Sequence, residues 1–232
     1  MFKTTLQDKI KQVSSSVVAV GFTPDSQHVT IIGSGFCITD DGKILTAAHV
    51  WNQIPENQRA NVKGFVLSEE MRDYFQRYKW IPMKLIKKDD ASDLAVLQLE
   101  EYKDTLLKKL KLGDSDALEM GQDVYFIGFP YAAQLINDGF GVSLIANKGI
   151  VSSIKRDGVN PEHPRNWIFV DTITNPGDSG CPLIDIDTNM VVGVNTISFR
   201  IQSQVMKNLD IREPMHIAGA KPINLAKKLL NE

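Results

Sequence analysis

The stretch that decides the fold contains a serine that lies two residues after one glycine and directly before another. It reads Thr174-Asn175-Pro176-Gly177-Asp178-Ser179-Gly180-Cys181-Pro182-Leu183. Because glycine reaches backbone conformations that other residues avoid, this stretch can form a tight turn that carries the Ser179 hydroxyl beside two exposed backbone N–H groups. We therefore expect a nucleophile and an oxyanion-binding turn on one segment.

A serine hydroxyl is a weak nucleophile at neutral pH, and it needs a base to take its proton and an acid to orient that base. The chain supplies both residue types upstream, in Thr46-Ala47-Ala48-His49-Val50 and in Asp93-Leu94-Ala95-Val96-Leu97. We predict that Ser179 attacks a carbonyl, that His49 accepts and returns the proton, and that Asp93 orients His49. The N–H groups of Gly177 and Ser179 are predicted to form the oxyanion hole.

Most of the chain is predicted to be β-strand. Short runs of β-branched and aromatic residues, separated by turn signals, lie on both sides of a charged connection at residues 100–120. Each side holds about six such runs. This number and spacing predict an all-β fold made of two six-stranded β-barrels.

Both ends of the chain show helical patterns. Apolar residues recur at helical spacing in residues 1–13, and Pro222 opens an apolar run near the C-terminus. We expect a single domain over residues 1–232, with an N-terminal helix at 1–13, a first barrel at about 14–100, a second barrel at about 121–221 and a C-terminal helix at 222–231.

Composition argues against several classes of function. The 26 basic and 28 acidic residues give a net charge of −2, so we expect no nucleic-acid partner. No apolar stretch approaches the roughly 18 residues that cross a bilayer, so we expect no membrane partner. Histidines and cysteines lack the spacing of zinc ligands, and the predicted chemistry needs no metal and no cofactor.

The compartment is predicted from two further observations. Residues 1–10 lack the apolar core of a signal peptide, and the whole chain has only two cysteines. Both observations predict a reducing, cytoplasmic location.

These motifs together resemble those of the trypsin-like serine proteases, and more closely those of the HtrA (DegP-like) branch. The resemblance spans roughly residues 15–230 and includes Gly33-Ser34-Gly35-Phe36, Leu112-Gly113-Asp114-Ser115, Ile127-Gly128-Phe129-Pro130, Gly149-Ile150-Val151-Ser152 and Val192-Gly193-Val194-Asn195-Thr196, besides the three motifs above. It implies a chymotrypsin-like double β-barrel, endopeptidase activity on a protein or peptide substrate, and a triad of His49, Asp93 and Ser179. We expect a protease domain without the PDZ domain of many relatives. Because HtrA relatives are often trimers, the resemblance leaves an oligomer open.

The same resemblance implies where a substrate would bind. Thr196, Ile197 and Ser198 would form the edge strand that pairs with the substrate backbone. The pocket for the residue before the scissile bond (P1) would be lined by Ile173, Ile217, Ala218 and Gly219. Since no carboxylate falls at the base of this pocket, we expect aliphatic side chains there and not Arg or Lys.

Two alternatives remain open. Asp178 has no activation-site amine to pair with, and Cys181 stands where these families usually have glycine, so the oxyanion turn could be misarranged. The chain would then be a catalytically silent or partner-activated module that binds peptides. A third function is that of an interaction protein that uses the aromatic insertion at residues 68–80. A disulfide between Cys37 and Cys181 is also left open.

Overall fold

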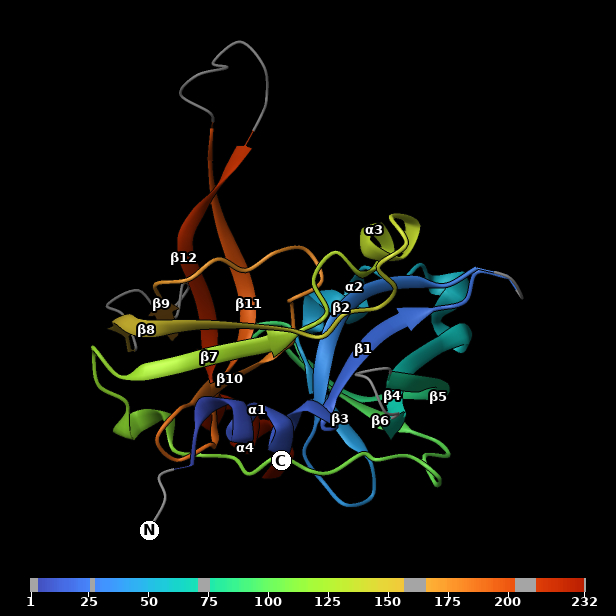
Figure 1. The fold of residues 1–232 in the computed structure, drawn as a ribbon, viewed down its shortest axis with the longest axis horizontal. Helices are drawn as coiled ribbons and strands as arrows, with labels where there is room; N and C mark the ends of the chain where they lie inside the picture. The colour runs from blue at the N-terminus through green and yellow to red at the C-terminus, as the bar shows by residue number, and fades with distance from the viewer. Residues whose placement is uncertain (1–3, 26–27, 71–75, 157–165, 203–211, 232) are drawn as a thin grey trace.

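The computed structural model describes residues 4–25, 28–70, 76–156, 166–202 and 212–231. In this structure, two closed antiparallel barrels of six strands lie side by side, and short helices stand at both ends of the chain (Figure 1). The predicted fold class is confirmed. That residues 1–232 form a single domain stays a prediction.

The first barrel follows the strand order β1-β2-β3-β6-β5-β4. Its strands are β1 (Val17–Phe22), β2 (Thr30–Cys37), β3 (Lys43–Thr46), β4 (Val62–Glu70), β5 (Gln76–Asp89) and β6 (Leu94–Leu99). Residues of the predicted insertion pair the end of β4 with the start of β5, and Phe65 stacks on Tyr78 with ring centroids 4.4 Å apart. Residues 71–75 of that insertion lie outside the described residues.

The second barrel follows the order β10-β11-β12-β9-β8-β7. Its strands are β7 (Asp123–Gly128), β8 (Ile145–Lys155), β9 (Trp167–Val170), β10 (Pro182–Asp185), β11 (Val191–Gln202) and β12 (Arg212–Pro222). The far parts of β11 and β12 pair only with each other among the described strands, and they form a hairpin that rises clear of the barrel (Figure 1).

In the described ranges, four α-helices accompany the barrels: α1 (Leu6–Ser14), α2 (Ala48–Asn52), α3 (Ala132–Asn137) and α4 (Ile223–Asn231). Thr5 and Asp8 form a capping box that starts α1. Short 3-10 turns lie at Glu56–Asn61 and Ser115–Ala117. No helix in the described ranges has the length and apolarity that crossing a membrane requires.

One apolar cluster joins the two barrels. It contains Phe36 from the first barrel and Tyr125 from the second, both with 1% or less of their surface exposed. Val13 of α1 and Leu229 of α4 pack into the same cluster. Because interiors are close-packed, this shared core fixes the position of one barrel against the other.

Candidate active site

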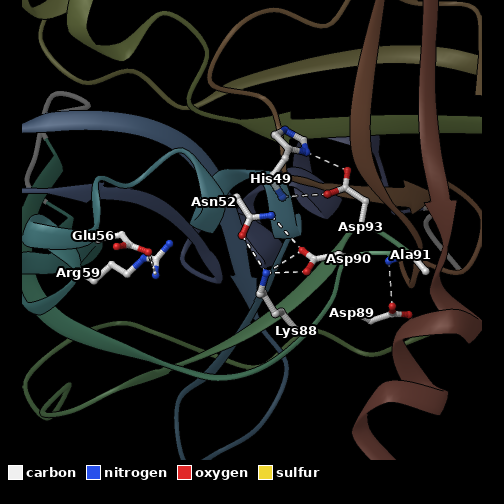
Figure 2. A network of polar contacts seen from close by, with 9 residues as sticks. All are labelled: His49, Asn52, Glu56, Arg59, Lys88, Asp89, Asp90, Ala91 and Asp93. Carbon is white, nitrogen blue, oxygen red and sulfur yellow. Dashed lines mark hydrogen bonds and ion pairs between the residues drawn. The ribbon is translucent and has the colours of Figure 1, made fainter.

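His49 and Asp93 meet at the N-terminus of α2. His49 is the second residue of this helix, and Asp93 directly precedes β6 with a φ of 54°, which is uncommon for a residue other than glycine. The Asp93 carboxylate accepts the His49 backbone N–H at 2.9 Å and lies 2.8 Å from ring Nδ1 (Figure 2). Because a carboxylate only accepts, Nδ1 carries the ring proton and Nε2 is left able to take one up.

The turn that carries Asp93 is tied to both ends of α2. The Ala48 N–H donates to the Asp93 carbonyl at 3.1 Å. At the other end, the Asn52 side chain donates to Asp90 at 2.9 Å, and Lys88 Nζ donates to the same carboxylate at 2.6 Å (Figure 2). The hydrogen bond from Lys88, followed by that from Asn52, lowers the pKa of Asp90. These contacts fix the helix against the turn.

Ser179 lies on a turn that docks onto the first barrel. Its carbonyl accepts the Ser34 N–H at 2.8 Å, and the N–H of the next residue, Gly180, donates to Asn195 at 2.7 Å. Gly180 has a φ of 85°, and a Cβ at this position would lie 2.1 Å from the Ser34 carbonyl oxygen. Only glycine fits there.

The Ser179 turn also lies beside α2. A Cβ on Gly33 would come within 2.7 Å of the Val50 side chain and 3.0 Å of the Ser179 carbonyl oxygen, so the helix and the turn share this contact point. Within the described part of the chain, no hydrogen bond joins Ser179 to His49. The structure therefore brings His49 and Asp93 into contact and places the Ser179 turn next to their helix, and the triad as a whole stays a prediction.

The Pro176–Gly177 peptide has a defined direction. The Pro176 carbonyl accepts the Tyr131 N–H at 2.7 Å. This peptide is trans, so the Gly177 N–H points opposite to the carbonyl and away from Tyr131. Gly177 itself has a φ of 101°, a conformation that suits glycine.

The direction of the Asp178–Ser179 peptide is also fixed by hydrogen bonds to its carbonyl. The Asp178 carbonyl accepts the Cys181 N–H at 3.0 Å and the Asn195 side-chain amide at 3.1 Å. The Ser179 N–H points away from these donors. Among the residues that the structure describes, neither this N–H nor that of Gly177 has a hydrogen-bond partner, which leaves both able to bind an anionic oxygen.

Ser34 connects this turn to the first barrel. Its fully buried hydroxyl donates to the Gly177 carbonyl at 2.7 Å and accepts the Phe129 N–H at 2.9 Å. Its carbonyl accepts the Thr46 hydroxyl at 2.6 Å. Sequence patterns do not reveal this role, because Ser34 and Gly177 are 143 positions apart. The only signal was a serine between two glycines at residues 33–35.

Asp178 finds its partner within its own turn. Only 1% of its surface is exposed, and its Oδ2 accepts the Asn175 N–H at 2.9 Å. Burial raises the pKa of Asp178 to about 7, although the hydrogen bond from Asn175 acts in the opposite direction. This carboxyl therefore changes its charge near neutral pH.

Cys37 and Cys181 are both free and buried. Cys37 packs in the core of the first barrel and Cys181 in that of the second, so the disulfide left open by the sequence is not formed. Burial raises the pKa of Cys37 to about 11 and raises that of Cys181 well above its ordinary value. Neither thiol is poised to react. No group of three or more acidic, histidine or cysteine side chains in the described part could hold a metal ion.

The residues predicted to bind substrate lie mainly on two paired strands. Thr196, Ile197 and Ser198 belong to β11, and Ile217, Ala218 and Gly219 belong to β12, with Ile197 opposite Gly219 and Ser198 opposite Ala218. Ala218 is fully buried in the core of the second barrel. Ile173 is half-buried in the segment before the Ser179 turn.

An apolar surface pocket of about 430 Å³ includes one of these residues, Ile217. Its other lining residues are Phe169, Phe199, Met215, Ser152 and Ser153. None of these lining residues is charged. Ile173 and Ser198 are not among them, so the predicted P1 residues do not all gather in one pocket.

A histidine–aspartate pair and a glycine-bearing serine turn, set between two six-stranded barrels, define the class of this protein. The family model for the trypsin-like peptidase domain matches residues 33–194. The chain belongs to this family.

Its relatives include named endoproteases. Periplasmic serine endoprotease DegP of Escherichia coli strain K12 is 31% identical over 195 residues, which cover 79% of this chain and 36% of DegP. The probable periplasmic serine endoprotease DegP-like of Pseudomonas fulva strain 12-X is 35% identical over 218 residues, which cover 94% of this chain and 39% of that protein. The chain thus spans less than two fifths of either. The predicted resemblance to the DegP-like branch is confirmed.

A solved structure shows the same fold. The crystal structure of Deg5 superposes with a TM-score of 0.68 at 24% identity, and the match covers 96% of this chain and 90% of Deg5.

The expected cytoplasmic location is wrong, because the names of these relatives place them in the periplasm. The expectation depended partly on the low number of cysteines. Cys37 and Cys181 lie in separate cores, so they stay unpaired in an oxidising compartment too, and their number carries no information on location.

Proposed function

We propose that this chain is a serine endopeptidase that hydrolyses peptide bonds through an acyl-enzyme on Ser179. The Asp93 carboxylate carries the proposal, because it binds both the backbone N–H and Nδ1 of His49 and so fixes the ring with Nε2 as the acceptor. The named endoproteases among its relatives support the same activity.

In the proposed reaction, the Ser179 Oγ attacks the substrate carbonyl carbon while its proton passes to His49 Nε2. The carbonyl oxygen takes the negative charge and binds the N–H groups of Gly177 and Ser179. Asp93 stabilises the imidazolium. The C–N bond then breaks, His49 gives its proton to the leaving amine, and the acyl group stays on Ser179.

Deacylation repeats these steps with water. His49 takes a proton from the water, the hydroxyl adds to the acyl carbon, and the second tetrahedral intermediate uses the same two N–H groups. Its collapse releases the carboxylic acid and returns the proton to Ser179. No metal or cofactor takes part.

We propose that the P1 pocket prefers aliphatic side chains. The predicted P1 residues Ile173, Ile217, Ala218 and Gly219 support this preference, since all four are uncharged and an apolar pocket disfavours a side chain that stays charged. The names of the relatives support a periplasmic location and proteins as substrates.

A partner-activated peptide-binding module is the second candidate. The observation that favours it is that His49 and Ser179 share no hydrogen bond in the described structure. In an active site without substrate, such a bond is often long, so this observation alone does not exclude catalysis.

The test compares wild type with Ser179→Ala on casein and on internally quenched peptides, and follows labelling by a fluorophosphonate with intact-mass spectrometry. We expect the wild type to cleave and to gain one label, and Ser179→Ala to do neither. Ser115→Ala is the control, because Ser115 lies outside the proposed site, where it is buried and its hydroxyl accepts the Asn224 N–H of α4. A wild type that neither cleaves nor labels, yet binds peptide, would establish the second candidate.

A further inference from the structure

One backbone edge of β11 has no partner in the described part of the chain. β11 pairs with β12 from Gly193 to Gln202, but with β10 only from Val191 to Val194. Asn195 then exchanges hydrogen bonds with the residues that follow Ser179. We call the unpaired edge from Thr196 to Ile201, opposite β12, the open edge.

The backbone groups at Arg200 point to the open edge. Arg200 lies opposite Pro214 of β12. Proline has no N–H to donate, so we infer that Arg200 and Pro214 form a non-hydrogen-bonded pair of the antiparallel ladder. The N–H and C=O of Arg200 then point away from β12, toward the open edge. The register shift between Ser198 and Arg200 places its extra residues on β12, so β11 itself is regular there. Because residues two apart on a regular strand point their backbone groups in the same direction, the N–H and C=O of Ser198 also point toward the open edge.

An apolar row borders the open edge. Ile197, Phe199 and Ile201 share one face of β11 by strand alternation, and 36% of Ile197 and 44% of Ile201 are exposed. Phe199 is packed in place, because its ring lies 5.6 Å from that of Phe169, which stacks on Trp167 at 6.3 Å. The row rises with the hairpin that stands clear of the barrel (Figure 1).

We propose that the open edge extends the substrate-binding strand, so that the segment on the N-terminal side of the scissile bond pairs with β11 from Thr196 to Ile201. This inference rests on the proposed function, which uses only Thr196 to Ser198. The added part, Phe199 to Ile201, supplies the backbone groups of Arg200 and the apolar row. The full stretch is about 20 Å long, at roughly 3.3 Å per residue.

Continuity with the serine turn identifies the occupant as an extended polypeptide. The open edge begins beside Ser179, since Gly180 donates to Asn195, and it runs away from the turn past one register shift between Asn195 and Ile197. Antiparallel pairing is more stable than parallel pairing. A substrate that pairs antiparallel with β11 runs toward Ser179, so its scissile bond reaches the serine. Its N-terminal flank then covers the open edge, with apolar side chains at alternate positions against the row.

The test uses peptides with one cleavage sequence and an N-terminal flank of three or six residues. We expect kcat/KM to be about tenfold higher for the longer flank, as two added backbone hydrogen bonds would give. Lengthening the C-terminal flank should change it little. Arg200→Pro removes the N–H at the open edge and should abolish the gain, so that this variant cleaves the two peptides with the same kcat/KM. Arg200→Ala keeps the N–H and should keep the gain.

Binding of the same peptides to Ser179→Ala separates this inference from the proposed function. If no peptide is cleaved but the longer flank still binds about tenfold tighter, the proposed function fails and the inference holds. Equal kcat/KM and equal affinity for both flanks would overturn the inference and leave the proposed function intact. Dimerisation that Arg200→Pro abolishes, without any effect of flank length, would assign the open edge to a second copy and also overturn it.

Discussion

The Ser34 hydroxyl of the first barrel donates a hydrogen bond of 2.7 Å to the Gly177 carbonyl of the second. Gly177 supplies one of the two N–H groups proposed to bind the oxyanion. The position of that group therefore depends on a side chain from the opposite barrel, and the same hydroxyl accepts the N–H of Phe129 at the end of β7. Ser34 acts as a positioning residue, because its own side chain does not reach the reacting atoms.

Replacing Ser34 by alanine tests this role. The change leaves the Gly177 carbonyl and the Phe129 N–H buried without partners, at a cost of about 1–3 kcal/mol in the free energy of unfolding. We expect kcat to fall at least tenfold with little change in KM, since the oxyanion forms only in the transition state. Steady-state kinetics and urea unfolding check both effects. Ser115→Ala should lose stability but keep kcat, and an unchanged kcat in Ser34→Ala would refute the role.

The backbone of Tyr131 gives a second test. Tyr131 has a φ of 49°, and its N–H holds the Pro176 carbonyl. Tyr131→Gly keeps the N–H and relieves the conformation, so we expect activity close to that of wild type. Tyr131→Pro removes the N–H and forces φ to about −65°, so labelling by a fluorophosphonate should slow at least tenfold. Equal labelling rates for the two variants would contradict the assignment.

Asp178 predicts how stability depends on pH. In the unfolded chain this carboxyl loses its proton near its ordinary pKa of 3.8, but in the folded protein it does so only near 7. The folded state binds more protons between these values, so this group makes stability fall as pH rises from about 4 to 7 and level off above. Asp178→Asn stays neutral and can still accept the Asn175 N–H. It should be more stable than wild type at pH 8, by on the order of a few kcal/mol, and this difference should shrink toward pH 4.

Urea unfolding of both proteins from pH 4.5 to pH 8 measures that difference in the free energy of unfolding. The contributions of the other titrating groups cancel, because both proteins contain those groups. A difference that is independent of pH would show that Asp178 titrates normally in the folded protein.

Asp93 and Asp90 offer a matched pair of carboxylates on one turn. Asp93→Asn removes the acceptor that fixes His49 Nδ1, and we expect kcat to fall by about 10⁴. Asp90→Asn loses only contacts with Lys88 and Asn52 at an exposed position, so its kcat should fall less than tenfold. If Asp93→Asn and Asp90→Asn lowered kcat by the same factor, Asp93 would act only by stabilising the turn.

Local patterns were sufficient to predict the two barrels, and they supplied the candidate residues of the site. Alternating apolar runs and Asp-Gly turns mark the strands, and the residues around Ser179 carry their own glycine requirements. The contacts that hold the turn were not predictable in this way. Ser34 and Tyr131 reach Gly177 and Pro176 across the molecule, and nothing in their neighbouring sequence specifies those partners.

Two other features of the site were not predictable from the sequence for similar reasons. The partner of Asp178 is a backbone N–H three residues away, which residue types alone do not reveal. The predicted substrate residues Ile217 and Ala218 are adjacent in sequence, but their side chains lie on opposite faces of β12. Ile217 therefore lines the surface pocket, whereas Ala218 lies in the core.

The apolar cluster shared by Phe36, Tyr125, Val13 and Leu229 has a consequence for how the protein fails on heating. Since neither barrel keeps a complete interior without the other, we expect a single cooperative melting transition, and fragments cut at residues 100–120 should not fold separately. Heat inactivation would then coincide with melting. Packing far from the serine turn would set the highest temperature at which the protein can work.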